Sequence, residues 1–86
     1  MAEYTVVFAR SARRELERLE VGMARRIISR IEALAGDPRP RGSVKLQGAA
    51  DLWRIRVGDY RVIYSVDEDA RLVDIRVVRH RSDAYR

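Results

Sequence analysis

Apolar and polar side chains alternate along two neighbouring stretches near the middle of the chain, residues 52–57 and 60–66, and the pair Gly58-Asp59 separates them. Two runs rich in β-branched and aromatic residues around a Gly-X pair are typical of a β-hairpin with a two-residue, type II′ turn. In this register one side of the hairpin is apolar, and we expect that side to face the core. The directly opposed apolar pairs are Val57 with Tyr60, Ile55 with Val62 and Trp53 with Tyr64.

The other side of the hairpin presents three arginines, Arg54, Arg56 and Arg61, and places Arg56 directly across from Arg61. Like charges in opposed positions destabilise a strand pair, and nothing in the packing of the hairpin requires them. A multivalent anion would relieve the repulsion, and phosphate suits the planar, forked donors of guanidinium groups. A solvated basic face is the alternative interpretation, because a register slip of one residue would scatter these side chains.

Two amphipathic helices joined by a short turn are predicted before the hairpin. Apolar residues recur at helical spacing over residues 11–19, with Ser11 as the N-cap, and again over residues 23–35. Gly22 should separate the two helices, and Gly36 occupies the position expected for a glycine C-terminal cap. Together they form a helical hairpin that can cover one face of a sheet.

Two further strands flank these elements. Residues 3–9 have apolar side chains on both faces, so we place this strand inside a sheet or under helices rather than alone at an edge. In the last strand, residues 72–78, the apolar residues Val73, Ile75 and Val77 alternate with Asp74 and Arg76.

The connections complete the predicted architecture. Residues 37–43 form an irregular basic loop, residues 44–50 lead into the hairpin, and residues 67–70 make a second turn. The fold class is therefore α+β, with an antiparallel meander of three strands and an N-terminal strand packed on a two-helix hairpin. The element order is β-α-α-β-β-β.

Length and charge narrow the class of protein. The 86 residues suffice for one small core, so residues 1–86 are treated as a single domain. Residues 39–86 hold eleven Arg or Lys against seven acidic residues and so carry +4 of the formal charge of +5, which suggests a nucleic acid or another polyanion as partner. Without cysteine, a long apolar run or a leader, we expect a soluble, cytoplasmic protein that does not bind a membrane.

Few residue types are available for chemistry. There is no glycine-rich phosphate loop and no cysteine nucleophile, and His80 is the single histidine. The acidic run Asp67-Glu68-Asp69 is interpreted as a solvated turn, so no metal site and no cofactor are expected. What remains is the arginine cluster with His80 and Tyr85, a set suited to holding a phosphodiester while its charge grows during cleavage.

Four sequence blocks in this order resemble the RelE branch of the RelE/ParE superfamily of toxins from type II toxin-antitoxin systems. The blocks are Lys45-Leu46-Gln47-Gly48, Leu52-Trp53-Arg54-Ile55-Arg56-Val57, Gly58-Asp59-Tyr60-Arg61-Val62-Ile63-Tyr64 and Arg79-His80-Arg81-Ser82-Asp83-Ala84-Tyr85. The resemblance covers nearly the whole chain and implies a RelE-like fold. It also implies an endoribonuclease that enters the ribosomal A site and cuts mRNA there by metal-free attack of a 2′-hydroxyl.

The resemblance assigns roles to individual residues. Arg54 and Arg56 match two basic positions of the second strand, one that stabilises charge and one proposed as proton acceptor; Arg61 matches a phosphate-binding arginine, and Arg79 an arginine at the leaving group. Tyr85 matches a tyrosine that stacks on or orients a nucleotide. The type member of the family has lysine at the positions of Arg54 and Arg56, and a guanidinium with a pKa above about 12 is a poor base.

Other residues are weaker candidates for the site. His80 could supply proton transfer near neutral pH, although strand alternation would turn it away from Arg79, and a structural or RNA-contact role is the alternative. We expect Arg41, Lys45 and Arg81 to contact the RNA.

Two other functions are kept beside the nuclease. One is a ParE-like protein that inhibits DNA gyrase by binding it, and the other is a catalytically degenerate toxin homologue that binds nucleic acid. Resemblance to the superfamily also implies a RelB-like antitoxin, acidic and partly disordered, that covers the basic surface. Ribosome and mRNA would be the other partners, and operator DNA would be bound only by the toxin-antitoxin pair.

Overall fold

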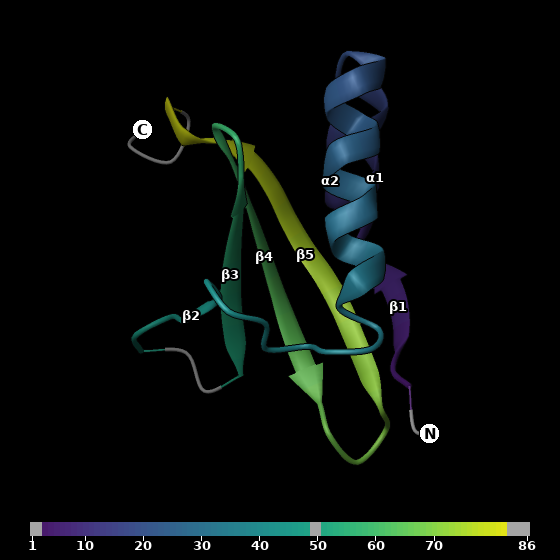
Figure 1. Cartoon of the computed structure of the whole chain (residues 1–86), viewed down its shortest axis with the longest axis vertical. Coiled ribbons are helices and arrows are strands. Elements are labelled where there is room, and N and C mark those ends of the chain that lie inside the picture. Colours follow the sequence, from purple (N-terminus) through teal and green to yellow (C-terminus); the bar gives the residue numbers. More distant parts are fainter. Residues whose placement is uncertain (1–2, 49–50, 83–86) are drawn as a thin grey trace.

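Two helices pack on one face of a five-stranded mixed sheet, which confirms the predicted α+β class (Figure 1). The computed structural model describes residues 3–48 and 51–82. None of the helices in this described part has the length and apolar character needed to cross a membrane. The elements are β1 (Thr5–Phe8), α1 (Arg10–Arg18), α2 (Val21–Ala33), β2 (Val44–Lys45), β3 (Leu52–Val57), β4 (Tyr60–Asp67) and β5 (Leu72–His80).

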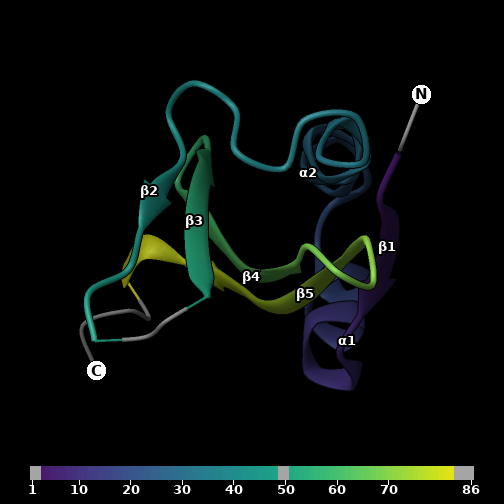
Figure 2. The ribbon, with the colours of Figure 1, turned by 90° about the horizontal axis from the view of Figure 1, so that it is seen from below.

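The sheet has the strand order β1-β5-β4-β3-β2. Strands β3, β4 and β5 form the predicted antiparallel meander, and the two-residue β2, which was expected only as a lead-in, extends it beside β3. Figure 2 shows β2 and β3 at one side of the molecule and the helices with β1 at the other. Strand β1 is an edge strand that pairs in parallel with β5, so the expectation that it lies inside the sheet was wrong. Its side chains alternate between half-buried and exposed, and the half-buried Val6 and Phe8 pack against the core with the helices, as the other expected placement requires.

The helices begin and end slightly away from the predicted signals. Ser11 lies inside α1 and is not its N-cap, because the chain already turns helical at Arg10. Glu20 caps α2 instead, since its carboxylate accepts hydrogen bonds from the backbone N–H groups of Gly22 and Met23, and Gly22 therefore lies within the first turn of α2. Gly36 does not adopt the positive φ expected of a glycine C-terminal cap.

The β3–β4 hairpin has the predicted register. Val57 pairs with Tyr60, Ile55 with Val62 and Trp53 with Tyr64, while Arg56 lies opposite Arg61. Gly58 has a φ of 59°, and Asp59 is not among the residues with positive φ, as a type II′ turn requires.

Strand β5 departs from simple alternation. Ile63 pairs with Val77 but Tyr64 pairs with Ile75, so Arg76 is an extra residue that forms a bulge. The bulge shifts the alternation, so Val78 is buried in the core, and Val77 does not share a face with Val73 and Ile75 as the predicted alternation has it. The strand also continues beyond the predicted end at Val78 to His80.

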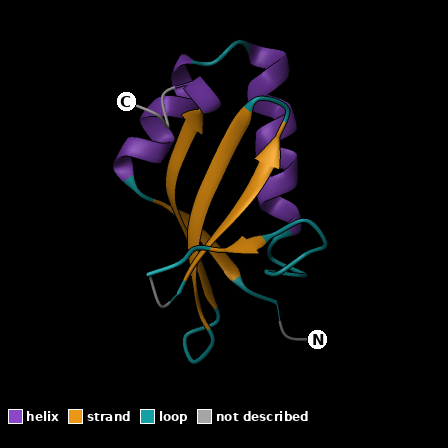
Figure 3. Ribbon diagram, turned by 90° about the vertical axis from the view of Figure 1, so that its left-hand side faces the viewer, coloured by secondary structure: helices purple, strands orange, loops and turns teal. Residues whose placement is uncertain are grey.

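One apolar core lies between the helices and the inner face of the sheet. Its buried members from the helices are Ala12, Leu16, Ile27, Ile31 and Leu34, and those from the sheet are Ile55, Val57, Val62, Tyr64, Val66, Val73, Ile75 and Val78. Figure 3 views the meander from the side that the helices leave open. We call this open side the outer face.

Candidate nucleic-acid interface

Three arginines from three adjacent strands form a straight row across the outer face. Arg56 on β3 lies directly opposite Arg61 on β4, and Arg61 lies directly opposite Arg79 on β5. Directly opposed Cα atoms are about 5 Å apart, so the row spans roughly 10 Å at right angles to the strands. We call these three residues the arginine row.

Arg54 adds a fourth guanidinium beside the arginine row. It lies two residues before Arg56 on the same face of β3, and it is half-buried. Its Nε atom is buried and has no hydrogen-bond partner among the described residues. Burial lowers the pKa of Arg54, and the charges of Arg56 and Arg61 lower it further. The cationic form is thus held in a place that disfavours it, which an anion would correct.

A hollow of about 550 Å³ lies between the arginine row and the β3–β4 turn. Arg56, Arg61 and Arg81 contribute to its lining together with Ser82 and the turn residues 58–60. The backbone N–H of Arg81 donates a 2.7 Å hydrogen bond to the carbonyl oxygen of Asp59, which ties the end of β5 to the β3–β4 turn. Arg81, expected as an RNA contact, is thereby brought into the same site as the arginine row.

His80 lies on the other side of the sheet. It pairs with Tyr60, and the two rings meet edge to face with centroids 5.1 Å apart. The backbone N–H of Ser82 donates to Nδ1 of His80 at 3.1 Å, and the Ser82 hydroxyl lies 2.8 Å from the same atom. Since a backbone N–H can only donate, these contacts favour an Nδ1 that accepts and a neutral ring with its proton on Nε2. This geometry gives His80 a packing role and turns it away from the arginine row.

Of the other expected site residues, Lys45 is not brought to the row. Lys45 pairs with Trp53 and therefore lies on the side of the sheet opposite to Arg54 and Arg56. Arg41 is exposed in the loop between α2 and β2. Tyr85 lies outside the described residues, so its expected nucleotide contact stays a prediction.

The assembled site is a shallow cationic surface. Forked guanidinium donors on neighbouring strands can bind two or more oxygens of one phosphate and stabilise extra negative charge on it. The predicted hairpin identified Arg54, Arg56 and Arg61 from alternation alone. It did not find the tie between Arg81 and Asp59, because nothing local signals a contact across 22 residues.

Comparison with known proteins agrees with the fold. The model of the family described as the ParE toxin of type II toxin-antitoxin systems, parDE, matches residues 6–85. The toxin RelG of Mycobacterium tuberculosis is 32% identical over 84 residues, which cover 96% of this chain and 97% of that protein. The putative toxin RelE1 of Methanocaldococcus jannaschii is 36% identical over 59 residues, or 65% of this chain and 66% of that protein.

Solved structures give the same assignment. The archaeal RelE-RelB complex from Pyrococcus horikoshii contains a chain with a TM-score of 0.82 and 34% identity, covering 94% of this chain and 97% of that one. The isolated RelE toxin of E. coli shares the fold, with a TM-score of 0.80. Fold and matches together define a toxin of a type II toxin-antitoxin system. The chain belongs to the RelE branch of the RelE/ParE superfamily.

Proposed function

We propose that this toxin is a ribosome-dependent endoribonuclease that cuts mRNA in the ribosomal A site. The arginine row is the observation that carries this assignment, because it gathers three cations from three strands at positions where a sheet alone would avoid them. A function that requires a bound phosphate explains why like charges are kept in register. The family resemblance supplies the reaction, and the open outer face gives single-stranded RNA access to it.

In the proposed reaction the ribose 2′-oxygen attacks the adjacent phosphorus and the bond from phosphorus to the 5′-oxygen breaks. The products are a 2′,3′-cyclic phosphate and a free 5′-hydroxyl, with one proton leaving the 2′-hydroxyl and one reaching the 5′-oxygen. Arg61 at the centre of the row would hold the phosphate, and Arg79 would lie at the leaving oxygen. Arg54 and Arg56 would stabilise the charge that develops on the phosphate oxygens.

Proton removal is the weak step of this site, because a guanidinium keeps its proton far above neutral pH. The lowered pKa of Arg54 goes in the direction that a proton acceptor needs. His80 is turned away from the row, so it is a poor candidate for this step. We therefore assign the ribosome the task of orienting the 2′-hydroxyl for in-line attack, which is consistent with a toxin surface that is open and shallow.

Primer extension on mRNA from cells that express the toxin tests this function. The wild-type toxin should stop growth and produce cuts confined to A-site codons, and the double variant Arg61→Ala, Arg79→Ala should do neither. Arg14→Ala is the matched control, since Arg14 is an exposed arginine on α1, away from the row. Unchanged toxicity of the double variant would refute the assignment.

Inhibition of DNA gyrase is the second candidate function, because the matching family model is described as a ParE toxin. The two functions differ in their first effect on the cell. A ribosome-dependent nuclease stops protein synthesis at once, whereas a gyrase poison first induces the response to DNA damage. A degenerate toxin homologue would bind RNA without producing cuts.

The proposal extends to partners. Relatives with this fold were solved as complexes of RelE with RelB, and we propose an acidic antitoxin for this toxin as well. Such a chain would bind the arginine row and block RNA, and its association rate should fall as salt rises. The pair, and not the toxin alone, would bind operator DNA, and both would act in the cytoplasm with the ribosome and mRNA.

A further inference from the structure

The outer face changes character along the strands, from cationic at one end to acidic at the other. Strand β4 shows the change in four consecutive outer positions, and its neighbours follow it. The outer residues, from the hairpin end onward, are Arg61, Ile63, Ser65 and Asp67 on β4, Arg56, Arg54 and Leu52 on β3, and Arg79, Val77, Asp74 and Leu72 on β5. From Arg61 to Asp67 the strand covers about 20 Å.

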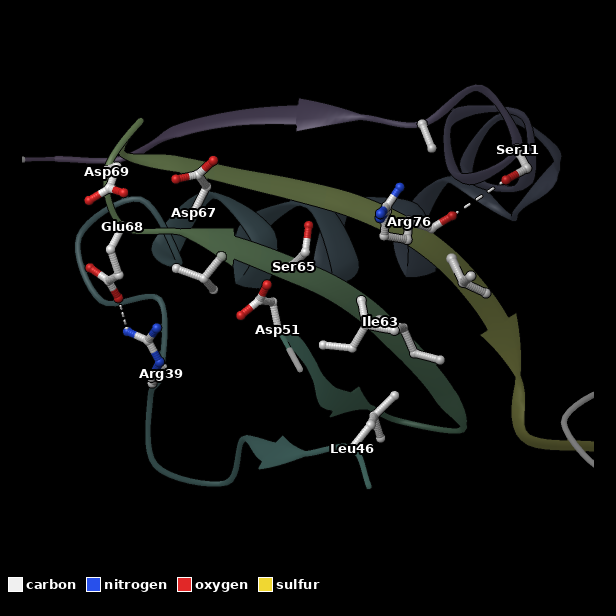
Figure 4. Close-up of a pocket in the computed structure, with 14 residues that line it drawn as sticks. Ser11, Arg39, Leu46, Asp51, Ile63, Ser65, Asp67, Glu68, Asp69 and Arg76 are labelled. Atoms are coloured by element: carbon white, nitrogen blue, oxygen red, sulfur yellow. Dashed lines mark hydrogen bonds and ion pairs between the residues drawn. The ribbon is translucent and has the colours of Figure 1, made fainter. Parts of the chain in front are cut away.

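A trough of about 1040 Å³ occupies the middle and the acidic end of this face (Figure 4). Its apolar lining includes Ile63 and Val77 from the sheet centre, with Leu46 and Leu52 from the β2–β3 side. Two cations, Arg39 and Arg76, also line it, and each lies beside a carboxylate. The first turn of α1 borders the opposite side, where the Ser11 hydroxyl donates to the carbonyl oxygen of Arg76. In Figure 4, Asp67, Glu68 and Asp69 lie together at one end, away from Ile63 and Leu46.

Four apolar residues that line the trough lie outside the core, although Val66, which also lines it, is a core residue. Ile63, Val77, Leu46 and Leu52 are half-buried, yet they are neither members of the buried cluster nor among the partly buried residues packed against it. The neighbouring Val44, which pairs with Arg54 on β3, is 44% exposed. An apolar strip of this kind is typical of a surface that a partner covers.

Three carboxylates at the acidic end have no cationic partner in the described part of the chain. Glu68 is paired with Arg39 and accepts from the Tyr4 hydroxyl, and Asp74 lies 3.7 Å from Arg76. For Asp51, Asp67 and Asp69 the described residues provide no ion pair, although Asp67 accepts from the backbone N–H of Ala70. We call these three residues the carboxylate end.

RNA cannot use the whole face, because the carboxylate end repels phosphates. A protein segment can use it if its own charges change sign in the matching direction. We propose that the arginine row, the trough and the carboxylate end together bind one segment of the antitoxin that is acidic at one end, apolar in the middle and basic at the other. This inference rests on the antitoxin proposed above and adds the chemistry that selects it.

The length of the face sets the size of the segment. About 20 Å corresponds to about 13 residues of α-helix or six residues of extended chain. The apolar floor supplies area to bury, and the two charged ends fix the direction in which the segment lies. The carboxylate end then distinguishes the two ligands of this surface, because the antitoxin segment contacts it and RNA does not.

Binding of designed peptides to the whole toxin tests the inference. The probe is a 14-residue peptide with four Glu, six alternating Leu and Ala, and four Lys; the control replaces the four Lys by Gln. On the wild-type toxin the Lys peptide should bind about five- to tenfold more tightly, which corresponds to two or three exposed charge pairs. On the double variant Asp67→Asn, Asp69→Asn the two peptides should bind within about twofold of each other.

Two controls keep the result interpretable. Asn at position 67 retains the oxygen that accepts from Ala70, and equal thermal unfolding of variant and wild type checks the fold; Asp51→Asn is a second variant for the same end. Glu17→Gln on α1 removes an exposed carboxylate elsewhere and should keep the preference for Lys. Equal affinity of the two peptides for the wild-type toxin overturns the inference, as does an unchanged preference in the Asp67, Asp69 variant.

Failure of this inference is distinguishable from failure of the proposed function. The Asp67→Asn, Asp69→Asn toxin should cut mRNA at the wild-type rate, because the carboxylate end lies about 20 Å from Arg61 and its repulsion of phosphate is screened over that distance at physiological salt. If the wild-type toxin shows no preference for the Lys peptide but still makes A-site cuts, only the inference about the antitoxin segment is refuted. If the wild-type toxin makes no cuts, the proposed nuclease function is refuted and the peptide result still stands.

Discussion

Tyr64 carries a polar hydroxyl into the centre of the core. Its side chain is completely buried, and the hydroxyl donates a 2.7 Å hydrogen bond to the carbonyl oxygen of Pro38. Burial is the main cause that raises the pKa of Tyr64 to about 12. This one side chain therefore holds the loop after α2 against the inner face of the sheet.

Replacing Tyr64 by Phe should lower the free energy of unfolding by about 1–2 kcal/mol at neutral pH, because the Pro38 carbonyl loses its buried donor. The wild-type protein should also lose stability as the pH rises from about 10 toward 12. Its folded-state pKa is raised, so the folded state resists ionisation that the unfolded chain accepts. Denaturant unfolding of both proteins at pH 7 and pH 11 measures this. The prediction fails if Tyr64→Phe leaves the free energy of unfolding unchanged at pH 7.

At the level of single residues, alternation predicted which hairpin side chains face outward, and it placed Arg54, Arg56 and Arg61 correctly. It placed Val77 on the wrong side because the bulge at Arg76 adds a residue that no periodic pattern contains. Arg79 was expected at the site only through the family resemblance. Its pairing with Arg61 depends on the registration of two strands, which the long-range fold sets.

At the level of elements, the meander keeps a line of like charges across its three strands. A directly opposed pair of like charges lowers the free energy of unfolding by about 0.2–1 kcal/mol, and Arg56 is the direct cross-strand partner of Arg61. The toxin thus gives up stability in its central hairpin to keep the arginine row.

Arg56→Gln should accordingly raise the free energy of unfolding by about 0.3–1 kcal/mol at low salt. The gain should shrink at about 1 M salt, where charges several ångströms apart are screened. Inorganic phosphate should stabilise the wild-type protein more than the variant, because the variant lacks one guanidinium of the proposed phosphate site. Thermal unfolding across salt and phosphate concentrations measures both effects, with Arg14→Gln as control. A variant that is less stable than wild type at low salt contradicts this account of the row.

A second set of contacts joins elements at the acidic end of the sheet. Glu68 in the β4–β5 turn accepts from the Tyr4 hydroxyl and pairs with Arg39, and the Arg39 guanidinium lies 5.3 Å from the centre of the Trp53 ring. The hydrogen bond from Tyr4 and then the contact with Arg39 lower the pKa of Glu68. The N-terminal segment, the loop after α2 and the β4–β5 turn are tied together by this carboxylate.

The contribution of Glu68 should depend on pH in a defined direction. A carboxyl with a lowered folded-state pKa stabilises the protein above its unfolded value of about 4.3, and this stabilisation is lost as the pH falls through the folded-state pKa. Glu68→Gln should therefore be less stable than wild type at pH 7, and the difference should shrink as the pH falls below the unfolded value. Urea unfolding at a series of pH values measures it. A difference that stays constant with pH would show that charge is not its origin.

The elements themselves were largely predictable, because helix and strand periodicities in this chain are regular. The parallel edge position of β1 was not, since a strand with two apolar faces indicates burial but not the partner that provides it. Helix starts were also displaced, because Glu20 caps α2 through its own carboxylate, a role for which serine or aspartate would be the usual signal.

At the level of the whole molecule, the helices bury one face of the sheet and leave the other as a surface with two charged ends (Figure 3). Fold and family can be predicted from the sequence blocks because the residues that mark the family are the same residues that form β3, the β3–β4 turn, β4 and the end of β5. The reaction does not follow from the fold in the same way, since it depends on the substrate that the arginine row meets. The proposed reaction would also need a proton acceptor, and the arginines of the outer face stay protonated at neutral pH.

The most direct test is a single-turnover cleavage assay with purified toxin and ribosomes programmed with a short mRNA that has a defined A-site codon. The wild-type toxin should cut within that codon and leave a 2′,3′-cyclic phosphate, and Arg61→Ala should slow the cut at least about 100-fold, as expected for losing a group that stabilises the transition state. Arg14→Ala should cut at the wild-type rate. Intact mRNA with the wild-type toxin, or an Arg61→Ala toxin that cuts as fast as wild type, would contradict the assignment of the arginine row as the site that binds the scissile phosphate.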